Sequence, residues 1–310
     1  MVKRRGQPVH GWVNLDKPCG ISSAKAVAIV RRVFDAAKAG HGGTLDPLAS
    51  GVLPIALGEA TKTVSYTMGK SKSYEFSLAW GAETSTDDTE GEVTCQSDIR
   101  PSDDDIDRAL KQFHGVIDQV PPDYSAIKIE GERAYDLARQ MGAGQPLLAL
   151  KPRKVRIDQF RRLDSDHAGA RFFVGCGKGA YVRALARDLG RALGSAAHVT
   201  SLRRLSVGQF HADHAISLDF LEKLTHSAAA FEHLHPVLSA LDDIPALPIS
   251  RAEATKLRHG QTLPALSASA QQRFAMLMTG STAIAIEGQN PVALVMLKAG
   301  AICPFRVLNL

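Results

Sequence analysis

Residues 73–80 carry the clearest strand pattern of the chain, because apolar side chains occupy every second position. These apolar residues are Tyr74, Phe76, Leu78 and Trp80. Alternation with a period of two places such residues on one face of a β-strand, and that face is expected to be buried. The spacing by itself therefore makes Tyr74 a core aromatic residue.

Other apolar patterns predict further strands and several helices. Strands are expected at residues 12–15, 153–161, 170–176, 283–286, 292–297 and 305–308. Helices are expected near residues 23–34, 102–113 and 180–193, the last ended by Gly194. Residues 211–246 are expected to be helical and then linker-like, and Ser250 with Glu253 forms a capping box for a short helix. These patterns predict strands and helices but do not arrange the strands in a sheet.

Charged residues are clustered in two segments, the predicted helix at 180–193 and residues 83–92. Arg183, Arg187 and Arg191 are four residues apart, so they share one face of the predicted helix. The spacing leaves Arg187 and Arg191 open as surface charges or as phosphate contacts. Residues 83–92 are rich in acids, but their spacing matches no EF-hand, so we expect a solvated or structural loop.

Residues 41–62 form the segment most typical of a functional site. Gly42 and Gly43 precede Asp46, and glycines allow a sharp turn or a close approach to a ligand. Pro47 disfavours helical dihedrals at Asp46, and the uncharged run 52–57 is predicted to be a buried anchor for the loop. On residue type alone, however, an Asp before a Pro is most often a turn former or a helix cap.

Composition places the chain among ordinary globular proteins, with one large or two modest domains. Its 310 residues are 45% hydrophobic and 22% charged, with a formal net charge of +5 and a pI of about 9.0. The charge is uneven: residues 151–204 hold 13 Lys and Arg against 4 Asp, whereas residues 83–105 hold 9 acids against 1 Arg. Such a distribution suits a protein that lays one face on a phosphate backbone.

Several features bear on cofactors and location. The four cysteines are far apart and form no C-x-x-C pair, so neither a zinc site nor a redox motif is indicated. The sequence contains no P-loop, no Rossmann turn and no metal-binding cluster, so no cofactor is expected. No apolar run approaches the roughly 20 residues that span a bilayer, and no signal-peptide pattern follows the basic N-terminus. We therefore expect a cytoplasmic protein that does not engage a membrane.

The segment from Gly40 to Lys62 resembles the nucleophile motif of the TruB family, the bacterial tRNA pseudouridine-55 synthases. That motif reads G-H-x-G-[ST]-L-D-P-x-A-x-G-x-L-P and is followed by a G-E-A-T-K box, and every fixed position is present here. Further resemblances are Lys72-Ser73-Tyr74, the run 176–183 and the run 198–205. Within the run 176–183, Gly177 and Ala180 depart from the usual C-S-K-G-T-Y-I-R, which removes hydroxyl groups at those two positions.

The resemblance implies a role for each of six residues. Asp46 would be the catalytic carboxylate, and Arg183 would pair with it. Tyr74 would stack on the target base, with Tyr181 and Leu202 as further walls of the pocket. His41 would fill the space that the flipped base leaves in the RNA.

The resemblance also implies a fold and an activity. The fold would be α+β, with a mixed, mainly antiparallel sheet and flanking helices in residues 1–244. A small β-rich domain resembling the PUA type would follow in residues 245–310. The enzyme would isomerise the uridine at position 55 in the T-loop of tRNA, as a monomer that binds the T-arm and needs no metal or cofactor. Asp46 could attack C1′ or C6 or abstract the 2′ proton, and the sequence leaves these routes open.

Two other functions are compatible with parts of the sequence. A glycosidase-like hydrolase normally needs two paired carboxylates, and only Asp46 has the context of a site. An RNA-binding or tRNA-folding protein without essential catalysis would instead use its basic residues and its C-terminal module.

Overall fold

The computed structural model describes residues 6–125, 128–129, 132–133, 150–265 and 280–310. A mixed, mainly antiparallel sheet runs through residues 11–235, in the order β14-β1-β3-β12-β4-β11-β10-β7, with β2, β13 and β15 paired alongside. Only the pairs β1–β14 and β3–β12 of this sheet are parallel among the described strands. The strands are β1 (Gly11–Lys17), β2 (Ala39–His41), β3 (Ser50–Leu57), β4 (Lys72–Trp80), β7 (Gly115–Gln119), β10 (Arg153–Ser165), β11 (Gly169–Cys176), β12 (Ala197–Val207), β13 (Phe210–His211), β14 (Ile216–Ser217) and β15 (Leu234–His235).

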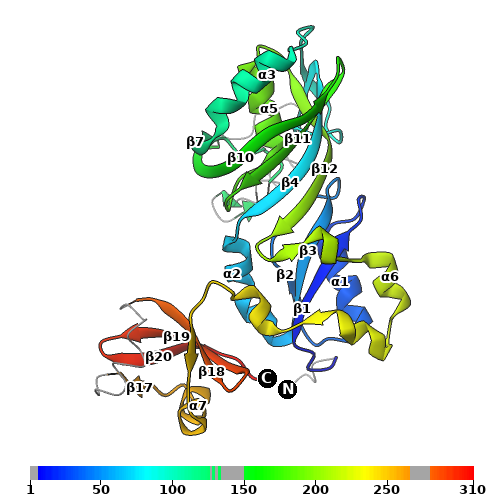
Figure 1. The fold of residues 1–310 in the computed structure, drawn as a ribbon. Helices are drawn as coiled ribbons and strands as arrows, with labels where there is room; N and C mark the ends of the chain where they lie inside the picture. The colour runs from blue at the N-terminus through cyan, green and yellow to red at the C-terminus, as the bar shows by residue number, and fades with distance from the viewer. Residues whose placement is uncertain (1–5, 126–127, 130–131, 134–149, 266–279) are drawn as a thin grey trace.

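The sheet has two halves that meet at a short contact. The lower half in Figure 1 contains β1, β2 and β3, and the upper half contains β4, β10 and β11, with β12 between them. β3 and β12 pair only at Ser50–Arg203 and Gly51–Arg204. Gly51 has φ +101°, and a Cβ there would lie 2.2 Å from the carbonyl oxygen of Arg204, so this junction requires glycine.

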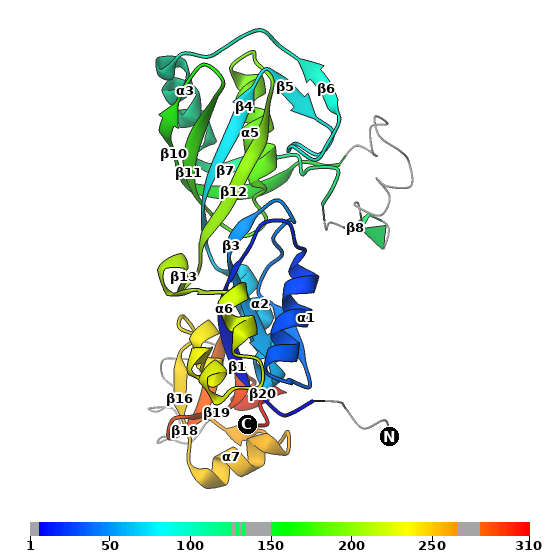
Figure 2. The ribbon, with the colours of Figure 1, turned by 90° about the vertical axis from the view of Figure 1, so that its right-hand side faces the viewer.

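Helices cover both halves and share one core. α1 (Ser23–Val33) and α6 (Leu218–Lys223) lie beside β1 and β3, whereas α5 (Val182–Ala192) and α3 (Asp103–Leu110) lie beside β12 and β10 (Figure 2). The Ser22 side chain accepts a hydrogen bond from the backbone of Lys25 and caps α1. None of the described helices is long and apolar enough to cross a membrane.

The alternation in β4 predicts its buried face correctly. Tyr74, Phe76, Leu78 and Trp80 are all buried, and Phe76 stacks on Phe172 with ring centroids 5.3 Å apart. The helical expectation for residues 211–246 is largely wrong. That segment contains one short α-helix, α6, together with 3-10 turns and two-residue strands. Pro236 and Pro245 exclude a continuous helix over its second half.

Residues from 246 onward build a second, five-stranded sheet in the order β16-β18-β19-β20-β17 with its own apolar core. Its elements are β16 (Ala246–Pro248), α7 (Arg251–Arg258), β17 (Leu263–Pro264), β18 (Thr282–Glu287), β19 (Asn290–Lys298) and β20 (Ala301–Val307). The predicted capping box is present, because Ser250 and Glu253 exchange side chain–backbone hydrogen bonds at the start of α7.

Three smaller elements flank the main sheet. β5 (Ala82–Thr84) and β6 (Val93–Gln96) form a hairpin that carries the acidic loop, and α2 (Val64–Gly69) precedes β4. The sequence of residues 131–139 predicts a turn and a helix, but these residues lie outside the described ones except for β9 (Glu132–Arg133), the partner of β8 (Lys128–Ile129).

Candidate functional site

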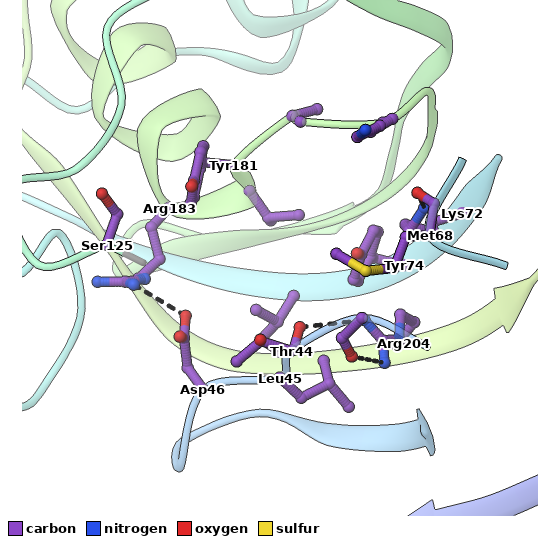
Figure 3. Close-up of a pocket in the computed structure, with 16 residues that line it drawn as sticks. Thr44, Leu45, Asp46, Met68, Lys72, Tyr74, Ser125, Tyr181, Arg183 and Arg204 are labelled. Atoms are coloured by element: carbon purple, nitrogen blue, oxygen red, sulfur yellow. Dashed lines mark hydrogen bonds and ion pairs between the residues drawn. The ribbon is translucent and has the colours of Figure 1, made fainter. Parts of the chain in front are cut away.

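A cavity of about 270 Å³ opens where the two halves of the sheet meet. Asp46, from the loop between β2 and β3, and Tyr74, from β4, line the cavity (Figure 3). Leu202 of β12 lines it as well. Tyr181 and Arg183, at the start of α5, line it from the other side. Five of the six residues implied by the sequence are therefore brought together, although they are up to 156 positions apart, from Asp46 to Leu202.

Asp46 is presented to the cavity by an ion pair with a buried arginine. The Arg183 guanidinium Nη2 lies 2.9 Å from Asp46 Oδ2, so the pairing that the resemblance implies is present. The side chain of Arg183 is 6% exposed, whereas that of Asp46 is 41% exposed. Arg183 also donates hydrogen bonds to the backbone carbonyls of Thr86 and Tyr124, which fix the guanidinium in place. A fixed guanidinium orients the carboxylate while leaving it open to a ligand.

The Asp46 loop is held by its backbone from two directions. Ser23 Oγ, at the first turn of α1, both donates to the carbonyl and accepts from the N–H of Leu45, at 2.8 Å each. The N–H of Gly20 donates to the carbonyl of Pro47 at 2.8 Å. Gly20 and Ser23, which lie between β1 and the first turn of α1, therefore serve the site, since they fix the residues on both sides of Asp46.

Arg204 provides a third clamp, which the sequence reading missed. It is 1% exposed and donates to three backbone carbonyls: Nε to Val52 at 2.7 Å, Nη2 to Gly43 at 3.0 Å and Nη1 to Thr44 at 3.2 Å. One guanidinium thus joins β12 to both ends of the Asp46 loop. The only signal in the sequence is the arginine pair at 203–204 in a predicted strand, where a buried charge is unexpected.

Two tyrosines line the cavity in their neutral form. Burial raises the pKa of Tyr74, and burial also raises the pKa of Tyr181. The backbone of Tyr181 is fixed by Gln119, whose side chain accepts from the Tyr181 N–H at 2.8 Å and donates to its carbonyl at 3.1 Å. Both phenols can therefore pack against a base and donate a hydrogen bond at neutral pH.

Lys72 also lines the cavity, and the spacing of residues in the sequence did not predict this. Its Nζ donates to the carbonyls of Met68 and Lys70, at 3.0 and 2.5 Å. Burial and then the nearby charge of Arg204 lower the pKa of Lys72 to about 8. The cavity also includes Lys178, so it carries cationic groups at its rim in addition to Arg183.

His41 is the one implied site residue that does not line the cavity. It ends β2, in register with Ile55 of β3, and is half-buried. Its Nδ1 has no hydrogen-bond partner within the described residues. Burial, and then the charge of Arg204, lower the pKa of His41. Its role toward RNA stays a prediction.

The three arginines of α5 each meet an acid of the loop at residues 83–88. Arg183 Nη1 lies 3.4 Å from Asp88, Arg187 Nη1 lies 2.9 Å from Asp87, and Arg191 Nη2 lies 2.6 Å from Glu83; these pairs form a ladder along the helix. Asp87 and Asp88 are buried. Glu83, Asp87 and Asp88 of the acidic loop therefore have a structural role, whereas Glu90 and Glu92 are exposed. Arg187 is buried in its pair, and Arg191 is a paired surface charge with a 59% exposed side chain.

Several basic residues of the segment 151–204 have acidic partners within the protein. Arg162, Arg183, Arg187, Arg191 and Arg203 form ion pairs with acids from other elements. Other basic residues of the segment, among them Arg153, Arg161 and Arg171, are exposed, so the expected phosphate-binding face stays a prediction. No group of three or more potential metal-ligating side chains occurs in the part of the chain that the structure describes.

Comparison with known proteins places this geometry in a class and a family. Residues 31–182 match the TruB family pseudouridylate synthase N-terminal domain, which makes the chain a pseudouridylate synthase by class. Residues 183–244 match the tRNA pseudouridylate synthase B C-terminal domain. A relative from Rhodospirillum rubrum, named tRNA pseudouridine synthase B, is 49% identical over 309 residues and covers 99% of each chain. One from Caulobacter sp. with the same name is 48% identical, again over 99% of each chain. The chain belongs to the tRNA pseudouridine synthase B family.

Solved structures agree with the fold. A chain of a Cbf5-Nop10-Gar1 complex is 26% identical with a TM-score of 0.70, covering 96% of this chain and 85% of that one. A chain of the archaeal box H/ACA sRNP Nop10-Cbf5 complex has a TM-score of 0.71 at 24% identity, covering 99% and 92%. The α+β pseudouridine synthase fold, with its β-rich C-terminal part, is therefore confirmed.

Proposed function

We propose that this enzyme converts the uridine at position 55 in the T-loop of tRNA to pseudouridine, with Asp46 as the reacting carboxylate. The observation that carries the proposal is the exposed carboxylate of Asp46, held by the buried Arg183 in a cavity walled by Tyr74 and Leu202. The names of the relatives support tRNA as the substrate.

The reaction requires little more than an oriented carboxylate. The N1–C1′ bond of uridine breaks, the base turns, a C5–C1′ bond forms, and the proton on C5 leaves while N1 gains one. The isomerisation is redox-neutral, so its balance needs no oxidant or reductant, and we expect no metal or cofactor. Asp46 can act by attack at C1′, by attack at C6, or by abstraction of the 2′ proton, and all three routes place it against the flipped nucleoside.

The walls of the cavity suit a flipped base. Taking a uridine out of its stack costs a few kcal/mol. Stacking on an aromatic side chain is worth about 1–3 kcal/mol per base, so Tyr74 offsets much of that cost. We infer that Leu202 packs on the opposite side of the base, with Tyr181 as a further wall. His41 is inferred to occupy the position in the RNA that the base vacates.

The structure bears on both rival functions. The nearest acid that shares an arginine with Asp46 is Asp88, which is buried and accepts hydrogen bonds from Thr86 Oγ1 and the N–H of Glu90. Asp88 does not line the cavity, so it is not placed as the second carboxylate of a glycosidase. A tRNA-folding activity would use the same binding surface without Asp46, and the variant below separates the two.

We further propose that residues 1–244 are the catalytic domain and residues 245–310 a PUA-like RNA-binding domain. We expect a monomer that binds the T-arm of tRNA in the cytoplasm.

The proposal is tested by mapping pseudouridine in an unmodified tRNA transcript. Wild type, Asp46→Asn and a matched control, Asp158→Asn, are incubated with the transcript. The control acid is exposed and pairs with Arg156 outside the cavity. Carbodiimide labelling with primer extension should give a stop at position 55 for wild type and control only. Stops at another uridine would contradict the substrate site, and free uracil in place of pseudouridine would support the hydrolase.

A further inference from the structure

The Gly-Glu-Ala-Thr-Lys box at residues 58–62 does not contribute to the cavity, although it follows directly on β3. It forms a 3-10 helix, η1 (Gly58–Thr63), at the end of β3 that lies away from Asp46. The structure places its two charged side chains against the last residues of the chain. The box therefore has a contact of its own that the reaction does not explain.

Glu59 and Lys62 hold the backbone on both sides of Leu308. Glu59 Oε2 accepts the N–H of Asn309 at 2.7 Å, and Lys62 Nζ donates to the carbonyl of Val307 at 2.7 Å. The two side chains are paired with each other at 2.6 Å and are 17% and 25% exposed. Burial alone would raise the pKa of Glu59, but hydrogen bonds from Lys62 and Asn309 outweigh it and lower that pKa, so the carboxylate stays ionised.

Leu308 is inserted between the two parts of the protein. It is 1% exposed and shares an apolar cluster with Trp12 of β1 and Val52 of β3. Ile284 and Leu294, from β18 and β19 of the C-terminal sheet, belong to the same cluster. Figure 1 shows the C-terminal sheet beside the lower end of β1. The C-terminal domain therefore packs on the face of β1 and β3 that points away from α1.

Strand β3 links this packing surface to the loop that carries Asp46. β3 begins just after the Asp46 loop and ends at η1, and its residues 51–57 are all buried. A rigid strand that carries the Asp46 loop at one end and the Glu59–Lys62 pair at the other sets the distance between the cavity and the C-terminal domain.

We propose that Glu59 and Lys62 are positioning residues that fasten the C-terminal domain to the catalytic domain, so that an RNA longer than the T-arm meets both surfaces at once. The part of this inference that concerns RNA rests on the proposed function. The pair binds backbone atoms, and its hold does not depend on the side chains of Val307 and Asn309. Loss of the pair weakens the attachment of the domain, which the apolar cluster around Leu308 still supports, without changing the cavity.

The fastening is tested without any RNA by hydrogen–deuterium exchange of the peptide 301–310. The variants are Glu59→Ala and Lys62→Met, each made alone. The control is Arg258→Met, which breaks an exposed pair with Glu287 at 2.8 Å within the C-terminal domain. A hydrogen bond to a charged group stabilises by roughly tenfold or more, so exchange should be about tenfold faster in both variants and unchanged in the control. Equal exchange in all four proteins would overturn the fastening.

The consequence for substrate is tested by kinetics on two RNAs, a complete tRNA transcript and a T-arm hairpin. Both variants should raise the KM for the complete tRNA about tenfold, with kcat unchanged, and should leave the KM for the hairpin as in wild type. Equal rises for both RNAs, or none for either, would overturn the positioning role. Failure of wild type to modify either RNA would sink the proposed function, while the exchange experiment would still decide the fastening.

Discussion

Replacement of Arg204 by methionine tests how far the geometry of the Asp46 loop depends on one buried guanidinium. Methionine replaces the apolar stem of the side chain but is shorter and removes every donor. The carbonyls of Val52, Gly43 and Thr44, which Arg204 now satisfies, would lose their partner inside the protein.

The substitution should lower both the free energy of unfolding and the rate of catalysis. A hydrogen bond to a charged group contributes about 1.5–3 kcal/mol, and the variant loses three of them but no longer buries a charge. We therefore expect the free energy of unfolding to fall by about 2–4 kcal/mol. The larger effect should be on kcat, because a displacement of about 1 Å at a reacting group can cost around 100-fold in rate.

The assay is single-turnover pseudouridine formation with saturating enzyme, at a temperature where circular dichroism shows the variant folded. Arg204→Lys is the companion variant, since one ammonium cannot reach all three carbonyls, and it should also lose most activity. A folded Arg204→Met protein with kcat within threefold of wild type would refute the idea that Arg204 positions the loop.

The remaining predictions concern the base contact, the arginine ladder and the cavity lysine. Tyr74→Phe should retain RNA binding, measured by filter retention, but lose turnover; full activity would remove any chemical role of its hydroxyl. Arg187→Met should lower the free energy of unfolding in urea by about 3–5 kcal/mol because its pair is buried, whereas Arg191→Met, with a 59% exposed side chain, should cost about 1 kcal/mol or less. The pKa of Lys72 is lowered to about 8 in the folded protein, so folding disfavours its charged form, and stability should rise from pH 8 to 10 by about 1–2 kcal/mol relative to Lys72→Met. Parallel pH profiles of the two proteins would contradict that last prediction.

Local signals predicted the local structure well. The period-two alternation placed Tyr74 on the buried face of β4, and the capping box of Ser250 and Glu253 located the start of α7. These features depend on neighbouring residues only, so the chain itself specifies them. The pairing of Arg183 with Asp46 came from resemblance, since 137 positions separate the two residues and no periodicity joins them.

Long-range polar contacts were the part that could not be predicted. Arg191 meets Glu83, Arg187 meets Asp87, and Arg204 meets backbone carbonyls, and none of these partners is marked by spacing. Composition counted these arginines toward a phosphate-binding face, whereas folding buries Arg187 against an acid and Arg204 against carbonyls. The surface on which the C-terminal domain packs could not be predicted for the same reason, because Glu59 and Lys62 bind backbone atoms.

The central claim is that Asp46, held by Arg183, drives the isomerisation. It is tested most directly by tritium release from C5-labelled uridine in T-arm RNA, with wild type and Asp46→Asn measured side by side in single-turnover reactions. Release by wild type and none by Asp46→Asn, with equal RNA binding, is the predicted result. Equal release by both proteins would show that the reacting group lies elsewhere and would contradict the account.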